Sequence, residues 1–142
     1  MMLLMKQIID NHKKLGDVGL KVTPQRLKIF EIFSSAKKPL TAEELFKNVS
    51  RPDFDLVTIY RTILTFEKVG IIRRVDTREK STRYELANSH HHHLICVKCN
   101  DIEDMILEKD LDKQEKIISQ TKKFKVLNHS LEFFGICRGC LN

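Results

Sequence analysis

The sequence predicts an α+β protein of two domains, at residues 1–87 and 88–142. Three observations carry this prediction. The first part reads as amphipathic helices with capping signals, followed by two short strands. After Leu86 the apolar period changes to that of strands around one further helix. The second part also holds two Cys-x-x-Cys motifs, which suit a small fold stabilised by a metal.

Capping signals mark the helices of the first part. A helix over "MKQIIDNHKKLG" comes first, and Thr23 followed by a proline predicts the start of a second. Thr41 and Glu44 form a capping box for a third helix, and a fourth begins near Asp55. The strands "IIRRVD" and "TRYEL", joined by the charged turn "TREKS", follow directly. Helices in this order before a basic hairpin predict a winged helix-turn-helix domain.

The net charge of +6 is confined to the first part of the chain. Residues 1–88 carry seventeen Lys and Arg against eleven Asp and Glu, whereas residues 89–142 carry eight of each. This asymmetry indicates that the first part binds a polyanion, although a solvated basic surface would give the same balance. No segment is long and apolar enough to span a membrane or to act as a secretory signal, so we expect a cytoplasmic protein.

The predicted fourth helix has a polar face suited to a DNA groove. Thr and Arg side chains can hydrogen-bond to base edges or phosphates, and Tyr can contact thymine methyl groups. A surface helix that touches only water would show the same pattern. The residues of this face are Thr58, Arg61, Thr62 and Thr65, with Tyr60 at its margin. The hairpin adds residues expected near phosphates: Arg73, Arg74, Arg78, Lys80 and Arg83.

The second part is expected to contain strands at "HLICVKC", "DIEDMIL" and "KVLNHSLEFFGIC", with a helix at "DLDKQEKIISQTKK". Its cysteines form the pairs Cys96/Cys99 and Cys137/Cys140. Two matched pairs in a reducing compartment favour one tetrahedral Zn²⁺ with four thiolate ligands. A redox dithiol is the alternative, but it usually accompanies a βαβ pattern that this sequence lacks.

A run of four histidines, residues 90–93, precedes the first Cys-x-x-Cys motif. An expression tag is disfavoured, because the run is internal and leads directly into a strand. Successive side chains of a strand point to opposite faces, so one run can supply two different metal sites. Imidazole with carboxylate suits Fe, Mn, Zn, Co or Ni. A polar strand that only faces water is the alternative.

The whole chain resembles the ferric uptake regulator family of metal-dependent transcription regulators. The motifs that carry the resemblance are "GLKVTPQRLKIFEIF", "TAEELF", "LVTIYRTILTFEKVGII", "RYEL", "HHHHLICVKC", "NHSL" and "CRGC". The resemblance implies a winged-helix DNA-binding domain and a zinc-stapled dimerisation domain, with metal sensing between them. It also implies a homodimer on a pseudo-palindromic double-stranded DNA operator.

The family pattern assigns residues to four sites. Structural Zn²⁺ falls on Cys96, Cys99, Cys137 and Cys140. A sensory site for Fe²⁺ or Mn²⁺, with Zn²⁺ as an alternative, falls on Glu85, His91, His93 and Asp104. An additional metal site falls on His90, His92, Asp112 and His129. The residues expected to contact DNA are Lys21, Arg26, Thr58, Tyr60, Arg61 and Thr62.

The sequence departs from the family at one position. Many relatives place a histidine of the DNA-binding domain in the sensory site, and the matching residue here is Pro39. Glu85 is then the one matched ligand on the DNA-binding side. Peroxide-sensing members use a histidine at the position of Pro39, and they tend to have aspartate at that of Glu85. We therefore rank iron sensing first, zinc sensing second and peroxide sensing third.

Three functions follow from these observations. The first is a metal-responsive repressor, expected to control genes of metal-ion uptake. The second is a regulator of the same family that binds DNA without a sensory metal, as Pro39 suggests. The third is a zinc enzyme, which we disfavour because neither H-E-x-x-H nor a deaminase signature occurs and a four-thiolate site has no open coordination position. No small-molecule substrate is expected.

Overall fold

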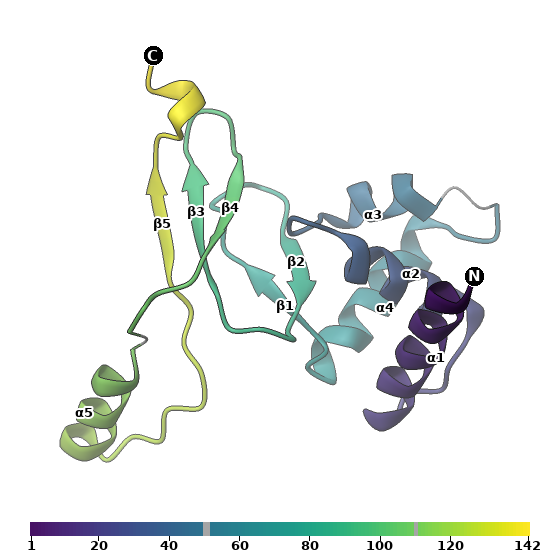
Figure 1. Cartoon of the computed structure of the whole chain (residues 1–142), viewed down its shortest axis with the longest axis horizontal. Coiled ribbons are helices and arrows are strands. Elements are labelled where there is room, and N and C mark those ends of the chain that lie inside the picture. The colour runs from purple at the N-terminus through teal and green to yellow at the C-terminus, as the bar shows by residue number, and fades with distance from the viewer. Residues whose placement is uncertain (50–51, 110) are drawn as a thin grey trace. The chain divides into compact units, whose positions relative to one another are not determined.

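The computed structural model describes residues 1–49, 52–109 and 111–142, and the chain divides into two compact units (Figure 1). These are Met1–Ser89 and His90–Asn142. Both units contain helices and strands, so the α+β class predicted from the sequence is confirmed. Among the described residues, no helix combines the length and the apolar composition needed to cross a bilayer.

The described part of the first unit consists of helices followed by a hairpin. Its elements are α1 (Met2–Asp17), α2 (Pro24–Ser35), α3 (Ala42–Val49), α4 (Leu56–Lys68), β1 (Ile72–Val75) and β2 (Arg83–Leu86). The first helix extends further toward the N-terminus than the sequence pattern predicts.

Side-chain caps begin three of these helices where the sequence predicts them. The Thr23 hydroxyl accepts a hydrogen bond from a backbone N–H of α2, and the Asp55 carboxylate does the same for α4. At α3 the capping box is complete, since Thr41 and Glu44 each accept from the other's backbone N–H, at 3.0 and 3.1 Å. Such a cap typically stabilises a helix by about 1 kcal/mol.

The core of the first unit lies between the helices. Ile59, Ile63 and Phe66 of α4 are fully buried, and the ring of Phe30 packs edge-on against Phe66 with centroids 6.2 Å apart. Burial of one such side chain contributes roughly 1.5–3 kcal/mol. This packing fixes which face of α4 is left for the solvent.

The hairpin is the wing of the domain. Strands β1 and β2 are antiparallel, with Arg73 opposite Glu85. The backbone of Leu40, just before α3, makes two hydrogen bonds of 2.8 Å with Tyr84 of β2. The wing is therefore tied by backbone to the segment that leads into α3.

The second unit is a small sheet with one helix and a short 3-10 turn. The described elements are β3 (His92–Cys96), β4 (Ile102–Met105), α5 (Asp112–Lys122), β5 (Glu132–Gly135) and the 3-10 helix η1 (Arg138–Cys140). The strand order is β4-β3-β5, with β4 antiparallel and β5 parallel to β3. The last strand is shorter than predicted, because residues 123–131 are irregular. The first residue of the predicted helix, residue 110, lies outside the described residues.

Candidate metal centres and DNA-binding face

The four cysteines meet at one end of the sheet in the second unit. Cys96 ends β3 and Cys99 follows in the adjoining turn, while Cys137 precedes the 3-10 helix and Cys140 is its last residue. Their sulfur atoms all lie within 4.8 Å of one another, and all four thiols are free. Two strands that run parallel thus deliver two Cys-x-x-Cys turns to the same place.

The geometry of this cluster fits Zn²⁺. The Sγ atoms of Cys99 and Cys137 are 3.7 Å apart. A tetrahedron with metal–sulfur distances of about 2.3 Å has edges of about 3.8 Å. With four thiolates the coordination is closed, so the cluster suits a structural zinc that cross-links β3 to the C-terminal turn.

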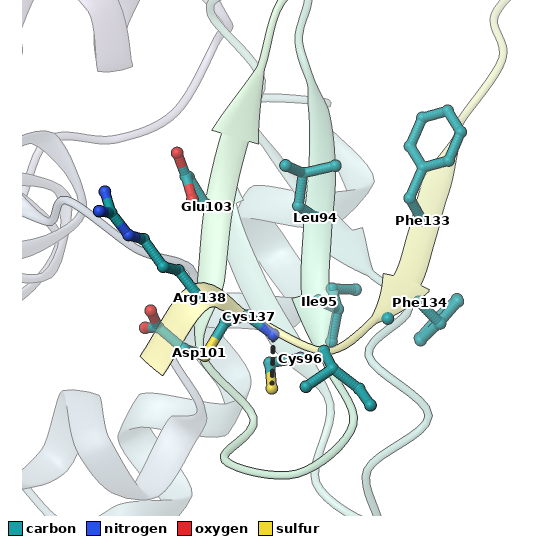
Figure 2. A pocket seen from close by; sticks show the side chains of 11 residues that line it. Leu94, Ile95, Cys96, Asp101, Glu103, Phe133, Phe134, Cys137 and Arg138 are labelled. Atoms are coloured by element: carbon teal, nitrogen blue, oxygen red, sulfur yellow. Dashed lines mark hydrogen bonds between the residues drawn. The ribbon is translucent and has the colours of Figure 1, made fainter. Parts of the chain in front are cut away.

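Backbone N–H groups already favour a thiolate in the cluster. Figure 2 shows the N–H of Cys137 donating to Sγ of Cys96, with N and S 3.3 Å apart. This bond and one from Cys99 lower the pKa of Cys96 to about 6. Hydrogen bonds with the thiols of Cys137 and Cys99 raise the pKa of Cys140 to about 12. These backbone hydrogen bonds favour the thiolate form of Cys96, and a bound cation would favour ionisation of a coordinating thiol.

The histidine run sends its side chains alternately to two groups of donors. His91 and His93 form one group with Asp104, and His90 and His92 form the other with His129. Both His92 and His93 are buried, at 2% and 3% exposure, although they are neighbours in β3. The alternation expected for a strand is therefore present.

The first group assembles across the β3–β4 ladder. His93 and Asp104 are register partners, and their Nε2 and Oδ1 atoms are 3.8 Å apart. His91 places its Nε2 3.7 Å from the same carboxylate oxygen, and the two imidazole rings are 4.9 Å apart. Two imidazoles and a carboxylate so arranged can share one divalent cation.

Glu85, the fourth expected ligand of this group, belongs to the first unit. It lies on β2, where its carboxylate accepts a hydrogen bond from Nε of Arg73 at 2.8 Å. Its participation in the sensory site stays a prediction.

The second group differs from the expectation in its carboxylate. The imidazole of His129 packs against those of His90 and His92, with centroids 4.6 and 5.5 Å apart. Its Nδ1 is 2.6 Å from Oε1 of Glu115. Among the described residues, the group of ligand atoms that meet here consists of the three histidines alone and includes neither Glu115 nor Asp112. The two acids are three residues apart on α5, so the sequence signal was an acidic helix face rather than one residue.

A carboxylate on Nδ1 of His129 has a chemical role. It fixes the orientation of the imidazole, which is how carboxylates support metal-bound histidines. Glu115 is thus a supporting residue of this group that sequence reasoning missed.

The polar face of α4 is narrower than the sequence suggests. Tyr60 is 42% exposed and Arg61 is exposed, but Thr62 is 7% exposed. The Thr62 hydroxyl donates to the backbone carbonyl of Thr58 at 2.9 Å. Thr62 therefore faces the core, and its assignment to the DNA-binding face is corrected.

The other expected DNA-binding residues lie near the starts of helices. Arg26 of α2 donates through Nη1 to the backbone carbonyl of Lys21 at 2.7 Å, so these two residues are linked. The hydroxyl of Tyr60 donates to Oε1 of Glu43 on α3 at 2.7 Å, and this bond raises the pKa of Tyr60. Thr58 lies in the first turn of α4, where its N–H donates to the side chain of the N-cap residue Asp55.

Most of the arginines expected near phosphates form ion pairs with carboxylates of the first unit. Arg73 pairs with Glu85, and Arg74 pairs with Glu67 through two bonds of 2.5 and 3.1 Å. These arginines have internal partners that the sequence pattern did not reveal.

Arg83 is the most buried of these side chains, at 16% exposure, and it has three acceptors. It contacts Glu79 at 2.6 Å, Glu44 at 2.9 Å and the backbone carbonyl of Pro39 at 3.1 Å. The Arg83 guanidinium holds the pKa of Glu79 below its usual range. Pro39, whose side chain offers no metal ligand, is itself fully buried.

A winged helix joined to a unit that gathers metal-binding side chains defines a class of metal-responsive, DNA-binding regulators. The model of the "Ferric uptake regulator family" matches residues 17–134. The chain therefore belongs to the ferric uptake regulator family, whose members are transcription regulators and not enzymes.

Individual relatives come from two branches of this family. The chain is 32% identical to the ferric uptake regulation protein of Legionella pneumophila, over 93% of this chain and 99% of that protein. It is 30% identical to the peroxide-responsive repressor PerR of Staphylococcus saprophyticus, over 94% and 91% respectively. Among solved structures, the ferric uptake regulator from Francisella tularensis with iron is 30% identical, has a TM-score of 0.72, and matches 87% of this chain and 96% of that one.

Proposed function

We propose that this protein is a homodimeric repressor that binds a pseudo-palindromic operator when a sensory metal is bound, and that it controls genes of metal-ion uptake. The observation that carries the proposal is the histidine strand. One run of side chains supplies two donor groups beside a third, all-cysteine cluster in the same small unit. Such a concentration of ligands serves metal binding rather than packing. A repressor acts where the chromosome is, so we place the protein in the cytoplasm.

The three donor groups have different chemistry and hence different roles. Four thiolates favour Zn²⁺ and close its coordination shell, which suits a permanent structural ion. The group of His91, His93 and Asp104, together with Glu85, would be the sensory site. Nitrogen and oxygen donors leave Fe²⁺, Mn²⁺ and Zn²⁺ as candidates. We rank Fe²⁺ first, supported by the iron-containing Francisella relative, and the match to PerR keeps peroxide sensing as an alternative.

The DNA-binding role rests on α4 and on residues near the start of α2. Arg61 and Tyr60 are exposed on this helix and can reach base edges or phosphates. Lys21, Arg26 and Thr58 would contact the DNA backbone or the adjacent groove. Two copies of the domain on one two-fold axis would read two half-sites, as expected for a symmetric dimer on a palindrome.

The partner in the dimer would be a second copy of the chain, bound through the second unit. Strand β5 is at the edge of its sheet, and none of the eleven residues of α5 is buried. Ile117 and Ile118 of α5 and Phe133 of β5 are 41–49% exposed. A pocket of about 320 Å³ lies along Leu94 and Phe133, on the sheet shown in Figure 2. Apolar side chains around an open strand edge favour association.

The test is metal-dependent binding to an operator. A DNA site would be selected from random sequence with the full chain and Mn²⁺, and its affinity measured against added Fe²⁺, Mn²⁺ and Zn²⁺ over a mild chelator. We expect one metal to tighten binding by about 5–150-fold, the usual range of allosteric coupling. Metal content per protomer should rise from one tightly held zinc to include a second metal.

A second function is favoured by Pro39. The family's inter-domain histidine is replaced by a buried side chain, so the dimer could bind DNA with its structural zinc alone. A response below about twofold to every metal in the same experiment would favour this alternative.

A further inference from the structure

We propose that Arg73 sets the metal affinity of the sensory site, because it competes with the metal for the carboxylate of Glu85. This inference rests on the proposed function, in which Glu85 is a sensory ligand. Arg73 itself donates no electron pair to a metal and acts only through its partner.

The wing brings Arg73 and Glu85 together by register. They face each other across the antiparallel ladder of β1 and β2, and Nε of Arg73 lies 2.8 Å from Oε1 of Glu85. The two side chains are 32% and 12% exposed. A short, charge-assisted hydrogen bond between partly buried groups is held more firmly than an ion pair at an open surface.

A divalent cation and a guanidinium make opposing demands on one carboxylate. Both are attracted by the same lone pairs, and the two positive charges repel each other when they share it. A metal that binds Glu85 must therefore either displace the guanidinium of Arg73 or bind while this positive charge stays close by. In either case the apparent affinity of the sensory site falls below what its donors alone would give.

Because position 39 is a proline, the effect of Arg73 on metal affinity acts on Glu85, the one expected ligand from the first unit. The family's histidine would have given the first unit a second donor. Without it, the first unit's contribution to the site passes through the residue that Arg73 holds. Arg73 would thus raise the metal concentration at which the regulator responds.

The experiment compares neutral and charged replacements at position 73. Every variant is the full chain with its structural zinc and carries His129→Ala, so that the second histidine group does not take up the probe. The probe is Mn²⁺, and its free concentration is read from its electron paramagnetic resonance signal. We expect Arg73→Gln to tighten Mn²⁺ binding at least about fivefold. Arg73→Lys, which keeps the charge, should stay within about twofold of the parent.

Arg74→Gln is the matched control. Arg74 lies on the same strand and has its own carboxylate partner, Glu67, which is not an expected metal ligand. It should leave Mn²⁺ affinity unchanged, whereas tightening equal to that of Arg73→Gln would show a general charge effect and overturn the proposal.

Glu85→Gln separates this inference from the proposed function. We expect it to weaken Mn²⁺ binding and to abolish the effect of Arg73→Gln when the two are combined. If Glu85→Gln alone changes nothing, the proposed ligand set is wrong and the inference falls with it. If Glu85→Gln weakens binding but Arg73→Gln leaves it unchanged or weaker, Arg73 orients Glu85 instead of competing, and only the inference is overturned.

Discussion

Two neighbouring residues on α4 have opposite environments. Arg61 is exposed, whereas Thr62 is buried with its hydroxyl bonded to the backbone. Arg61→Ala should therefore weaken operator binding by about 1–3 kcal/mol, as loss of one base-edge contact does, with little change in melting temperature. Thr62→Ala should lower stability by about 1 kcal/mol and leave affinity for DNA unchanged.

Gel shift and thermal unfolding of the same two samples would test this contrast. An Arg61→Ala dimer that binds the operator as tightly as the parent would remove Arg61 from the DNA-binding residues.

Glu115 is the second residue whose role only the structure reveals. Its contact with Nδ1 of His129 predicts that Glu115→Gln weakens metal binding at the second histidine group by about 10–100-fold, as loss of a supporting carboxylate does. Asp112→Asn, on the same helix, is the control and should have no such effect. Visible absorption of added Co²⁺ would report binding at this group. The opposite ranking of the two variants would restore the assignment made from sequence.

At the scale of elements, the wing is held by an internal ion-pair network. Arg83 joins the hairpin to α3 and to the segment before it, so it is committed to the fold. Arg83→Gln should thus lower stability without altering the salt dependence of operator binding. Lys80→Gln, at an exposed position of the turn, should reduce the slope of log affinity against log salt by about one. Operator affinities measured at several salt concentrations distinguish a residue that stabilises the fold from one that contacts phosphate. A reduced slope for Arg83→Gln would contradict the assignment of Arg83 to the fold.

Local signals in the sequence predicted the elements of the first unit well. Thr23, Thr41 and Asp55 begin their helices because a cap needs only residues a few positions away. The last strand was predicted less well, since residues 123–131 have a strand-like composition but form no strand of the described sheet. The arginine partners were also not predictable, because they depend on which side chains the tertiary fold brings together.

The candidate sites show the same contrast: features set by local spacing could be predicted, and contacts set by the tertiary fold could not. The cysteine cluster and the alternating histidines follow from spacing within single turns and strands. Thr62 was misplaced because the polar face of a helix was judged by residue type, and a threonine can bury its hydroxyl by bonding to its own helix. Glu115 was missed because three residues on a helix separate two acids by almost one turn.

For the whole molecule, we expect the structural zinc to contribute more to the stability of the second unit than to that of the first. Its buried described residues are few: His92, His93, Ile95, Cys96 and Ile102. A core of this size offers little hydrophobic stabilisation, whereas structural zinc contributes on the order of 10–16 kcal/mol in small modules. Removal of zinc by a strong chelator, or Cys137→Ser, should unfold the second unit and dissociate the dimer.

The first unit should survive this treatment, because its helices enclose their own core. Hydrogen exchange read segment by segment would show protection lost in β3, β4 and β5 and kept in α2 and α4. Loss of protection throughout the chain would mean that the two units do not fold independently.

The alternation of side chains along the histidine run also constrains how this protein can change. Removing or inserting one residue between the run and Cys96 would exchange the two faces, so that each histidine would meet the wrong set of partners. Adding two residues would restore the faces and merely shift them along the strand. An insertion or deletion in this segment should therefore preserve the two histidine groups when it changes the length by an even number of residues, and disrupt them when the number is odd. The substitution of a single histidine carries no such dependence on length.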